Sequence, residues 1–458
     1  MRGLAGSYGT PLFVYDEETL RARCREAAGA FDDGVAFASK SFLCGAMARL
    51  AFEEGLCIDV ATGGELDLVL RSGVPAGRTI MHGNNKSADE LERAIAVGVH
   101  RLVVDNFEEI ALLSTLVNAS APLDCLVRVT PGVEAHTHEF VRTGQEDTKF
   151  GFSVATGDAR RAIDELRAIP GLTLHGVHAV SYTHLHGSGA TNQSLAASVC
   201  EFDLVTADGE VVHIDESDPR FHGAVVALGA LGIVTALTLR IEPTFDVRQD
   251  VFVDMPWSGL GQLDEIMSSA YSVSLFTRWK GTVELVWTKS RYVEGAPAPS
   301  SLGGAVLATQ PMSPTGDDIA NTTDQCGVRG PWNEMLPHFR FDKIPSHGDE
   351  IQSEYFVRRE HAFEALNAIE RIGEKFSPHL IVSELRYVAA DALWLSPAYE
   401  RDSLAIHFTW KRHPLEVQDL LRLIEEILSP YQARPHWGKW FTMDASRISG
   451  LYLSLIHI

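Results

Sequence analysis

The sequence predicts two regions of different fold class, an α/β region up to residue 179 and an α+β region after it. In residues 1–179, short apolar runs alternate with amphipathic stretches, as is typical of parallel βα units. In residues 245–452, strand-like runs and amphipathic helices follow in an order typical of an α+β domain. Between them, residues 180–185 (VSYTHL) interrupt a strand pattern and are not rich in Pro, Gly or Ser, as a linker usually is.

Composition limits the classes of protein to consider. The chain has 458 residues, 45% hydrophobic and 22% charged, enough for two or three domains with buried cores. Its net charge of −22 disfavours binding to nucleic acid or anionic membranes. The absence of a membrane-length apolar run and of a signal-peptide core predicts a cytoplasmic protein. Six scattered cysteines predict thiols rather than disulfides or a zinc site.

The first region predicts an incomplete TIM-type barrel. It has six strand-like runs, whereas a closed (β/α)8 barrel needs eight. Three amphipathic stretches each end in glycine, which commonly stops a helix. The predicted strands are 35–38, 57–61, 79–81, 101–105, 125–130 and 174–179, and the predicted helices are 45–55, 64–73 and 88–98.

Lys40 is the first candidate for chemistry. It follows the first predicted strand, in VAFASKS, and barrel chemistry takes place where strands end. A lysine there could bind pyridoxal phosphate covalently if its surroundings lower its pKa. On its own, the residue is better explained as a solvated lysine at a strand end.

Several motifs extend this interpretation over the whole first region. They are YGTPLFVYD, FASKS, DVATGGEL, MHGNNKS, VDNFEEI and VRVTPGVEAHTHEFVRTGQEDTKFGF. The region resembles the amino-terminal barrel of diaminopimelate decarboxylases, which are fold-type III pyridoxal-phosphate enzymes. The resemblance implies decarboxylation of meso-diaminopimelate to L-lysine, with the cofactor held by Lys40 and contacted by Asp59, His82 and Arg128. Glu65 occupies another family motif on the same side of the barrel.

Simpler roles stay open for these residues. Asp59 and Glu65 could cap the helix that begins near Gly63, and Arg128 could form a salt bridge at the barrel rim. His136 and His138 have the spacing of a strand face, but we interpret them as loop residues, and no metal is predicted. Val180 stands where the family has a histidine that stacks on the cofactor. Since later family segments are also missing, we expect this region neither to fold stably nor to decarboxylate.

The second region opens with a glycine-rich segment, HGSGATNQSLA. Its glycines would let backbone amides approach a phosphate or a ring carbonyl. A DG turn at 208–209, a strand at 211–215, a small-residue helix at 223–232 and a strand at 233–243 follow. This pattern predicts a cofactor-binding layer over 186–244. Beyond it we predict strands at 272–279 and 282–287, a loop-rich stretch at 295–331, and helices at 359–372 and 415–428.

Motifs of the second region point to a different family. They are HGSGATNQ, TADGEVV, GALGIVT, NTTDQCGVRGPWNEMLPHF, SELRYVAADALWLSPAYERD, HFTWK and RPHWGKWFTM. The region resembles bacterial alditol oxidases, VAO-type flavoproteins related to aldonolactone oxidases. The resemblance implies a partial FAD-binding subdomain at 186–244 and a substrate domain at 245–452. It implies FAD contacts by Ser188, Asn192, Gln193, Ser194, Leu195 and Ile233, and a site around substrate and flavin made of Glu384, Arg386, Thr409, His436 and Lys439.

The residue types agree with that chemistry. Glu384 and Arg386 are two apart in a strand-like run, so they share a face. Fixed cations such as Arg386 and Lys439 suit the negative charge of a reduced flavin, while Glu384 and Thr409 could hydrogen-bond substrate hydroxyls. The alternative is a surface ion pair between Glu384 and Arg386.

The function predicted first is oxidation of an alditol to an aldose with reduction of oxygen to hydrogen peroxide. The alternatives are diaminopimelate decarboxylation, aldonolactone oxidation, and a scaffold protein without either cofactor. Because family segments that complete both sites are missing, we expect weak FAD binding and an inactive chain. Oligomeric state is left open.

A single DNA sequence, read in two frames, can account for both residues 180–185 and residues 453–458. The codons CTG TCT CTT ATA CAC ATC would encode LSLIHI, the tail of the chain, and the same DNA entered at its third base and followed by T reads GTC TCT TAT ACA CAT CT, which encodes VSYTHL with any final base. That DNA resembles the transposase end sequence used in sequencing libraries. We hypothesise that both hexapeptides are translated adapter and that the chain joins two truncated genes; the alternative is a genuine fusion protein.

Overall fold

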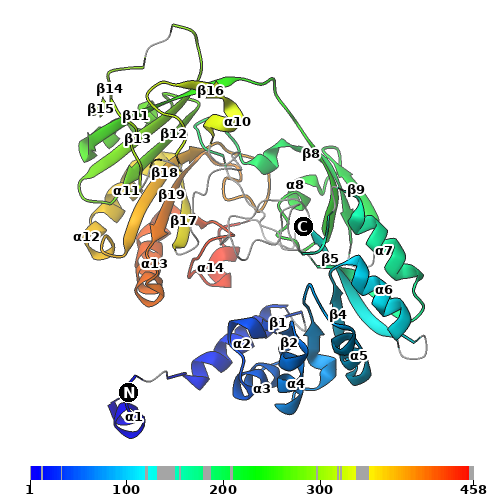
Figure 1. Ribbon diagram of the computed structural model, residues 1–458. Coiled ribbons are helices and arrows are strands. Elements are labelled where there is room, and N and C mark those ends of the chain that lie inside the picture. Colours follow the sequence, from blue (N-terminus) through cyan, green and yellow to red (C-terminus); the bar gives the residue numbers. More distant parts are fainter. Residues whose placement is uncertain are drawn as a thin grey trace. The chain divides into compact units, whose positions relative to one another are not determined.

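The computed structural model describes two compact units, which are treated separately below (Figure 1). Unit 1 comprises Met1–Ala135 and Glu139–Ser181, and unit 2 comprises His136–His138 and Tyr182–Ile458. The described residues are 2–11, 14–31, 34–118, 122–130, 150–153, 156–178, 187–206, 210–295, 298–316, 319, 322–336 and 350–452. The predicted loop histidines His136 and His138, the DG turn and both hexapeptides lie outside these ranges.

Unit 1 is built on a parallel sheet in which successive strands are neighbours, as in a (β/α) barrel. The order is β1-β2-β3-β4-β5, and β5 also pairs with β6 and β7. All six predicted strands are present, each within two residues of its predicted start. The strands are β1 (Ala36–Ala38), β2 (Cys57–Val60), β3 (Thr79–Met81), β4 (Arg101–Val104), β5 (Leu123–Thr130), β6 (Phe152–Ser153) and β7 (Leu172–His178).

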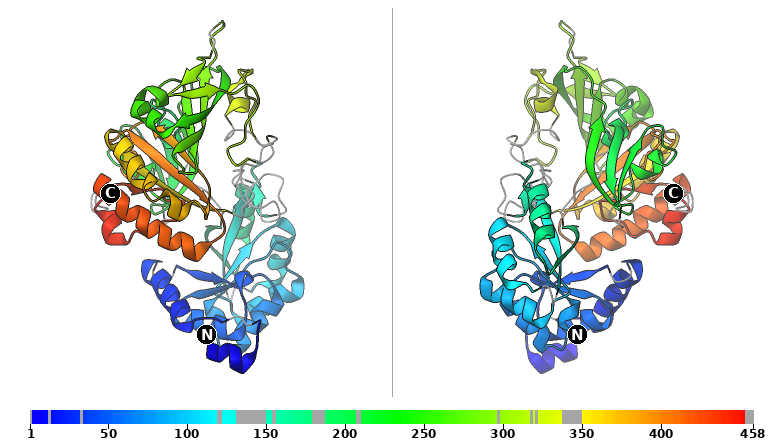
Figure 2. Two further views of the ribbon diagram at one scale, coloured as in Figure 1. Left: turned by 90° about the vertical axis from the view of Figure 1, so that its left-hand side faces the viewer. Right: turned by 90° about the vertical axis from the view of Figure 1, so that its right-hand side faces the viewer.

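Apart from α1, the helices of unit 1 lie along the outside of its strands (Figure 2). Capping residues set the starts of two of them: Thr62 begins α4 and Ser87 begins α5, each in a capping box with a glutamate three residues on. The helices are α1 (Arg2–Tyr8), α2 (Glu17–Phe31), α3 (Gly45–Glu53), α4 (Gly63–Arg71), α5 (Ala88–Val97), α6 (Phe107–Leu116) and α7 (Asp158–Ala168).

Unit 2 begins with a small antiparallel sheet of order β10-β8-β9, formed by Ile233–Leu239, Val199–Val205 and Val211–Asp215. The helix predicted at 223–232 is wrong: α8 spans only Phe221–Ala224. The chain then turns with positive φ at Leu228, Gly229 and Gly232, values of 52°, 77° and 146° that a right-handed helix cannot contain.

The larger sheet of unit 2 has ten antiparallel strands. Its order is β14-β15-β11-β13-β12-β18-β19-β17-β20, with β16 beside β11. Three short strands, β14, β15 and β16, occupy described parts of the stretch predicted to be only loop. The strands are β11 (Asp246–Pro256), β12 (Ser272–Thr277), β13 (Thr282–Arg291), β14 (Ser301–Leu302), β15 (Ala305–Leu307), β16 (Arg329–Pro331), β17 (Ile351–Arg358), β18 (Leu380–Val388), β19 (Ser403–Trp410) and β20 (Arg434–Pro435).

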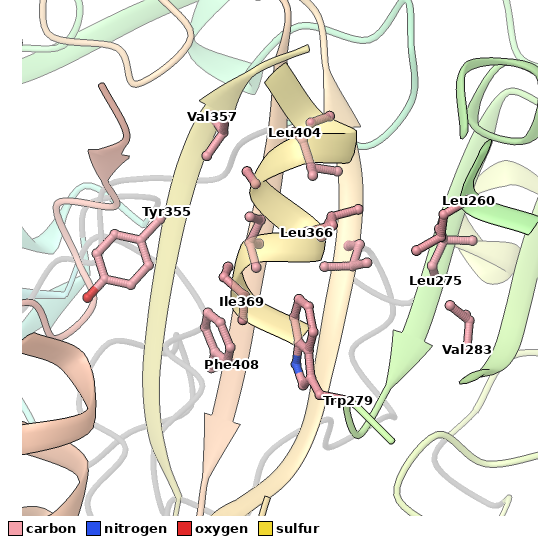
Figure 3. Packing of buried hydrophobic residues seen from close by; sticks show 14 of the residues in the cluster. Leu260, Leu275, Trp279, Val283, Tyr355, Val357, Leu366, Ile369, Leu404 and Phe408 are labelled. Atoms are coloured by element: carbon pink, nitrogen blue, oxygen red, sulfur yellow. The ribbon is translucent and has the colours of Figure 1, made fainter. Parts of the chain in front are cut away.

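One face of this sheet forms the main core of unit 2. Leu366 and Ile369 of α11 pack toward Phe408 of β19 and Trp279 (Figure 3). The indole nitrogen of Trp279 donates to Oγ of Ser383 at 2.7 Å, which satisfies its buried N–H. The helices are α9 (Leu263–Met267), α10 (Trp332–Met335), α11 (Ala362–Glu370), α12 (Gly373–Phe376), α13 (Pro414–Leu428) and α14 (Ala445–Ser449). The opposite face carries a second, smaller apolar cluster of Val251, Phe276, Leu285, Trp287 and Val382.

No helix within the described ranges is long and apolar enough to cross a membrane.

Candidate functional site

The residues predicted to surround the substrate lie on neighbouring strands of the ten-stranded sheet. Glu384 of β18 pairs with His407 of β19, and His407 pairs with Glu354 of β17. Cross-strand partners face the same side. The intervening residues of these strands, such as Leu385 and Ile406, belong to the core. The polar residues thus form a row on the face opposite to that core.

Glu354 is the centre of this row. Its carboxylate accepts a hydrogen bond from Nζ of Lys439 at 2.5 Å and lies 3.5 Å from Nη2 of Arg386. Nδ1 of His407 is 3.8 Å from the other carboxylate oxygen. The Glu354 side chain is 0% exposed, so its charge is balanced by buried partners rather than by water.

Arg386 joins Glu354 to Glu384. Its Nε lies 3.6 Å from Oε1 of Glu384. The shared face predicted from the two-residue spacing is confirmed. The alternative of a surface ion pair is wrong, because the Arg386 side chain is only 8% exposed.

His407 connects Lys439 to Thr409. Burial and the charge of Lys439 lower the pKa of His407 to about 4, so its ring is neutral at pH 7. Nζ of Lys439 lies 2.8 Å from Nδ1, and a neutral Nδ1 accepts this hydrogen bond. The ring proton is then on Nε2, 3.2 Å from Oγ1 of Thr409. Thr409 therefore receives a hydrogen bond from His407 and has its own hydroxyl hydrogen to donate.

The surroundings of Lys439 affect both its protonation and its position. Burial lowers the pKa of Lys439, and the Glu354 carboxylate opposes this shift. His436 accepts a hydrogen bond at Nδ1 from the amide of Gly438 at 3.0 Å, and its ring stacks on Phe356. The tight HWG turn expected from sequence thus positions the lysine.

The glycine-rich loop packs against the end of β18. The amide of Gly189 donates to the carbonyl of Tyr387 at 2.8 Å, and Oγ of Ser188 lies 2.8 Å from Oγ of Ser272. At φ 137°, Gly189 has a conformation that disfavours other residues, and a Cβ there would lie 2.2 Å from the carbonyl oxygen of Tyr271. The loop therefore requires glycine at this position.

Most side chains predicted to contact FAD are engaged by the protein. Asn192 donates to the carbonyls of Ser188 and Tyr271, Gln193 donates to Ala390, and Ser194 donates to Asp391. Leu195 and Ile233 are 43% and 45% exposed, and Ile233 lies in the three-stranded sheet. The amides of Gly189 and Asn192 are also used within the protein, by the carbonyls of Tyr387 and Gly189, so these contacts fix the shape of the loop.

In unit 1, the predicted cofactor residues gather at the carboxyl ends of parallel strands. Lys40 lies in the 3-10 turn Ser39–Ser41 after β1 and is exposed, Asp59 lies in β2, and His82 follows β3. Nε2 of His82 is 3.4 Å from Oδ1 of Asp59, and its ring meets that of His178 edge-on at 4.7 Å. Parallel strands bring these residues together although they lie far apart in sequence.

The electrostatics of this cluster fit a polar ligand. Burial raises the pKa of Asp59 to about 6, although Lys40 opposes the shift, and burial lowers the pKa of His82 to about 3. Oδ1 of Asp59 and Nδ1 of His178 are buried and receive or make no hydrogen bond within the described ranges. Unsatisfied buried polar atoms are costly, so they suit a bound group such as pyridoxal phosphate.

The simpler roles are divided among three residues. Glu65 caps α4, since its carboxylate accepts from the amides of Ala61 and Thr62. Asp59 does not cap that helix; it belongs to the strand before it. Arg128 does form a salt bridge: it donates to Asp105 at 3.0 Å, and the Asp105 side chain is only 2% exposed.

Comparison with known proteins divides the chain in the same way. A family described as "Pyridoxal-dependent decarboxylase, pyridoxal binding domain" matches residues 17–206, and one described as "D-arabinono-1,4-lactone oxidase" matches residues 348–457. The alditol oxidase of Streptomyces sp. (strain IKD472 / FERM P-14339) is 44% identical over 292 residues, 64% of this chain and 69% of that protein. The chain belongs to the alditol oxidase family.

The amino-terminal part of this alditol oxidase family member is similar to diaminopimelate decarboxylases instead. The diaminopimelate decarboxylase of Mycobacterium tuberculosis (strain ATCC 25618 / H37Rv) is 52% identical over 178 residues, 38% of this chain and 40% of that protein. That of Bacillus subtilis (strain 168) is 48% identical over 181 residues, 38% of this chain and 41% of that protein. The chain thus spans about 40% of the decarboxylases it matches.

A solved diaminopimelate decarboxylase from M. jannaschii, in complex with L-lysine, is 28% identical and covers 42% of this chain and 45% of that one. The TM-score of 0.34 is too low to establish a common fold.

Two residues of the row, Glu354 and His407, were not predicted from the sequence. Each had a signal: Glu354 interrupts the apolar strand SEYFV, and His407 lies two residues before Thr409, on the same strand face. In unit 1, sequence reasoning missed Asp105, which holds Arg128, and the buried ion pair of Lys86 with Glu109 at 2.9 Å. Within the described ranges, no group of three His, Cys, Asp or Glu side chains is placed to hold a metal ion.

Proposed function

We propose that unit 2 binds the substrate of an FAD-linked oxidase that converts an alditol to an aldose and oxygen to hydrogen peroxide. The observation that carries this proposal is the row of Lys439, His407 and Thr409 beside Arg386 and Glu384. FAD, when bound, would accept the hydride from the alcohol carbon. The loop that carries Ser188 and residues 192–195, together with Ile233, would hold it, as the resemblance to the family implies.

The row supplies one donor and one acceptor to neighbouring hydroxyls. Thr409 donates its hydroxyl hydrogen to a substrate oxygen, because Nε2 of His407 already donates to Oγ1. Glu384, whose side chain is 23% exposed, accepts from another hydroxyl. Lys439 and Arg386 place positive charge where the oxygen of the reacting alcohol becomes negative. This pairing suits a chain of adjacent hydroxyl groups.

The test measures substrate binding rather than turnover, since the chain is expected to be inactive. Sorbitol is titrated calorimetrically into the full chain and into Thr409→Val, which removes the hydroxyl but preserves the shape. We expect Thr409→Val to weaken binding about tenfold, and Thr315→Val, at an exposed loop position, to leave it unchanged. Equal binding by the three proteins would contradict the proposed role.

For unit 1 we propose that Lys40 binds pyridoxal phosphate, in keeping with a diaminopimelate decarboxylase. The exposed amine beside Asp59 and His82 supports it. Borohydride reduction after incubation with the cofactor should attach it to Lys40, as located by mass spectrometry, and Lys40→Ala should remain unlabelled. The buried Lys86 is an internal control; a label there, or none at all, would refute the assignment.

We also propose that residues 180–185 and 453–458 are translated adapter DNA. This proposal is supported by the fact that one DNA sequence, read in two frames, can encode both hexapeptides. Amplification from source DNA should succeed with primers inside each half and fail with primers in the codons for 147–152 and 229–233. A product of expected length with the VSYTHL codons would establish a genuine fusion instead.

A further inference from the structure

Three buried hydrogen-bond donors lie on the same face of the ten-stranded sheet as Arg386, beyond the row described above. Lys289 and Trp287 are alternate residues of β13, so their side chains share a face. Gln249 of β11 is the cross-strand partner of Lys289. Trp287 stands in one cross-strand row with Ser274 and Arg386, so the three donors adjoin the candidate substrate site.

Each of the three has a polar hydrogen without an acceptor among the described residues. Nε2 of Gln249 and Nε1 of Trp287 are buried and unpaired there. Nζ of Lys289 has no hydrogen bond or ion pair with any described residue, although it is not among the fully buried unpaired atoms. The ammonium only lies 5.8 Å from the centroid of the Trp287 ring. Gln249, Trp287 and Lys289 are 0%, 7% and 7% exposed. Burying a donor without an acceptor costs about 1–3 kcal/mol, so this arrangement suits a bound acceptor.

The chemistry of the three groups selects the acceptor. An indole N–H, an amide NH2 and an ammonium all donate, and the carbonyl oxygen of Gln249 already accepts from Thr323. A substrate hydroxyl would bring a hydrogen of its own, for which these groups offer no acceptor. A carboxylate only accepts, can receive several hydrogen bonds, and balances the charge of Lys289.

We propose that Lys289, Trp287 and Gln249 form a subsite for the carboxylate of a sugar acid, adjacent to the residues that bind hydroxyl groups. The inference of a bound carboxylate depends only on these three residues. The inference that the rest of the ligand is a hydroxylated chain rests on the proposed function. A ligand such as D-gluconate has both parts.

The experiment compares D-gluconate with sorbitol, which differ at one end only, a carboxylate in place of a CH2OH group. Calorimetric titration of the full chain should show gluconate binding at least about tenfold more tightly than sorbitol. Lys289→Met should remove most of that advantage and leave sorbitol binding unchanged, and Lys289→Arg should preserve it. Lys280→Met, at an exposed lysine, is the matched control and should behave as wild type.

Three outcomes would overturn the proposal: gluconate binding no tighter than sorbitol, an equal effect of the Lys289 and Lys280 substitutions, or loss of both ligands in a folded Lys289→Met protein. If Lys289→Met does not fold, Trp287→Phe decides, because it removes one donor and keeps most of the ring. It should weaken gluconate binding alone. Failure of the proposed function is distinguishable, since sorbitol binding would then be insensitive to Thr409→Val.

A pH series gives a second readout. Burial lowers the pKa of Lys289 to about 7, with Glu384 opposing the shift and Arg386 adding to it. Among the residues that the structure describes, Glu384 and Arg386 are the charged groups that shift the pKa of Lys289; Gln249 and Ser272 on the adjoining strands do not titrate. Because a carboxylate prefers the protonated amine, gluconate binding should be tightest below pH 7 and weaken above it. Lys289→Arg should remove this dependence.

Discussion

Glu354 shows how a single buried carboxylate can organise a site. It accepts a hydrogen bond from Lys439, lies near Arg386, and faces His407 from the neighbouring strand. A buried charge is tolerated only when partners replace water, and here the partners are the residues that would meet substrate. The same contacts that stabilise Glu354 therefore fix the positions of two cations and, through His407, the direction of the Thr409 hydroxyl.

Replacing Glu354 with Gln tests this role. The variant leaves Lys439 and Arg386 buried without their shared carboxylate, so we expect unfolding free energy of unit 2 to fall by about 3–5 kcal/mol, measured by urea denaturation. Glu360→Gln is the control, because the Glu360 side chain is 70% exposed. A loss no larger than that of the control would show that Glu354 is not needed to balance these cations.

His407 predicts a pH dependence of stability. Its pKa falls from an ordinary 6.5 to about 4 in the folded chain, so between these values only the unfolded chain binds the proton. Stability must then decrease as pH falls from 6.5 to 4. His407→Asn, which cannot titrate, should show a flatter profile than wild type in that window. His361→Asn, at an exposed histidine, should not; identical profiles for both variants would exclude His407 as the cause.

At the scale of elements, the alternation of residues along strands gave more correct predictions than the presence of small apolar residues did for a helix. It placed Glu384 and Arg386 on one face, and the alternating apolar runs located the six strands of unit 1. The helix at 223–232 failed because small apolar residues satisfy several conformations, and three positive φ values turn the chain there. The partnership of Glu354 with Lys439 was not predictable, since it depends on strand register between segments 85 residues apart.

The exposed edge strand β10 is expected to promote aggregation of the chain. All of its residues are exposed, it pairs only with β8 among the described strands, and it contains no charge or proline. An exposed apolar edge strand readily pairs with another chain. Val234→Lys should therefore slow aggregation of the chain, followed by light scattering at increasing concentration. Val293→Lys, at an equally apolar and exposed position outside any strand, should have less effect; equal slowing by both would indicate net charge as the cause.

At the scale of the whole molecule, the two units have separate hydrophobic cores. Residues of α4, α5 and the parallel strands form one core, and α11, α13 and the large sheet form another. Units with their own cores generally unfold as separate cooperative steps. From sequence we expected the first region not to fold stably, but its strands and helices share a buried core, so we now predict a separate unfolding step for each unit.

Scanning calorimetry of the full chain should resolve two transitions that respond to different ligands. Pyridoxal phosphate at about 100 times its dissociation constant should stabilise only the transition of unit 1, by about 2.7 kcal/mol, because a ligand stabilises the unit that binds it. Lys40→Ala should lose this shift, while Thr409→Val should keep it and instead reduce the shift produced by sorbitol in the other transition. A single transition that both ligands raise together would show that the two units fold as one.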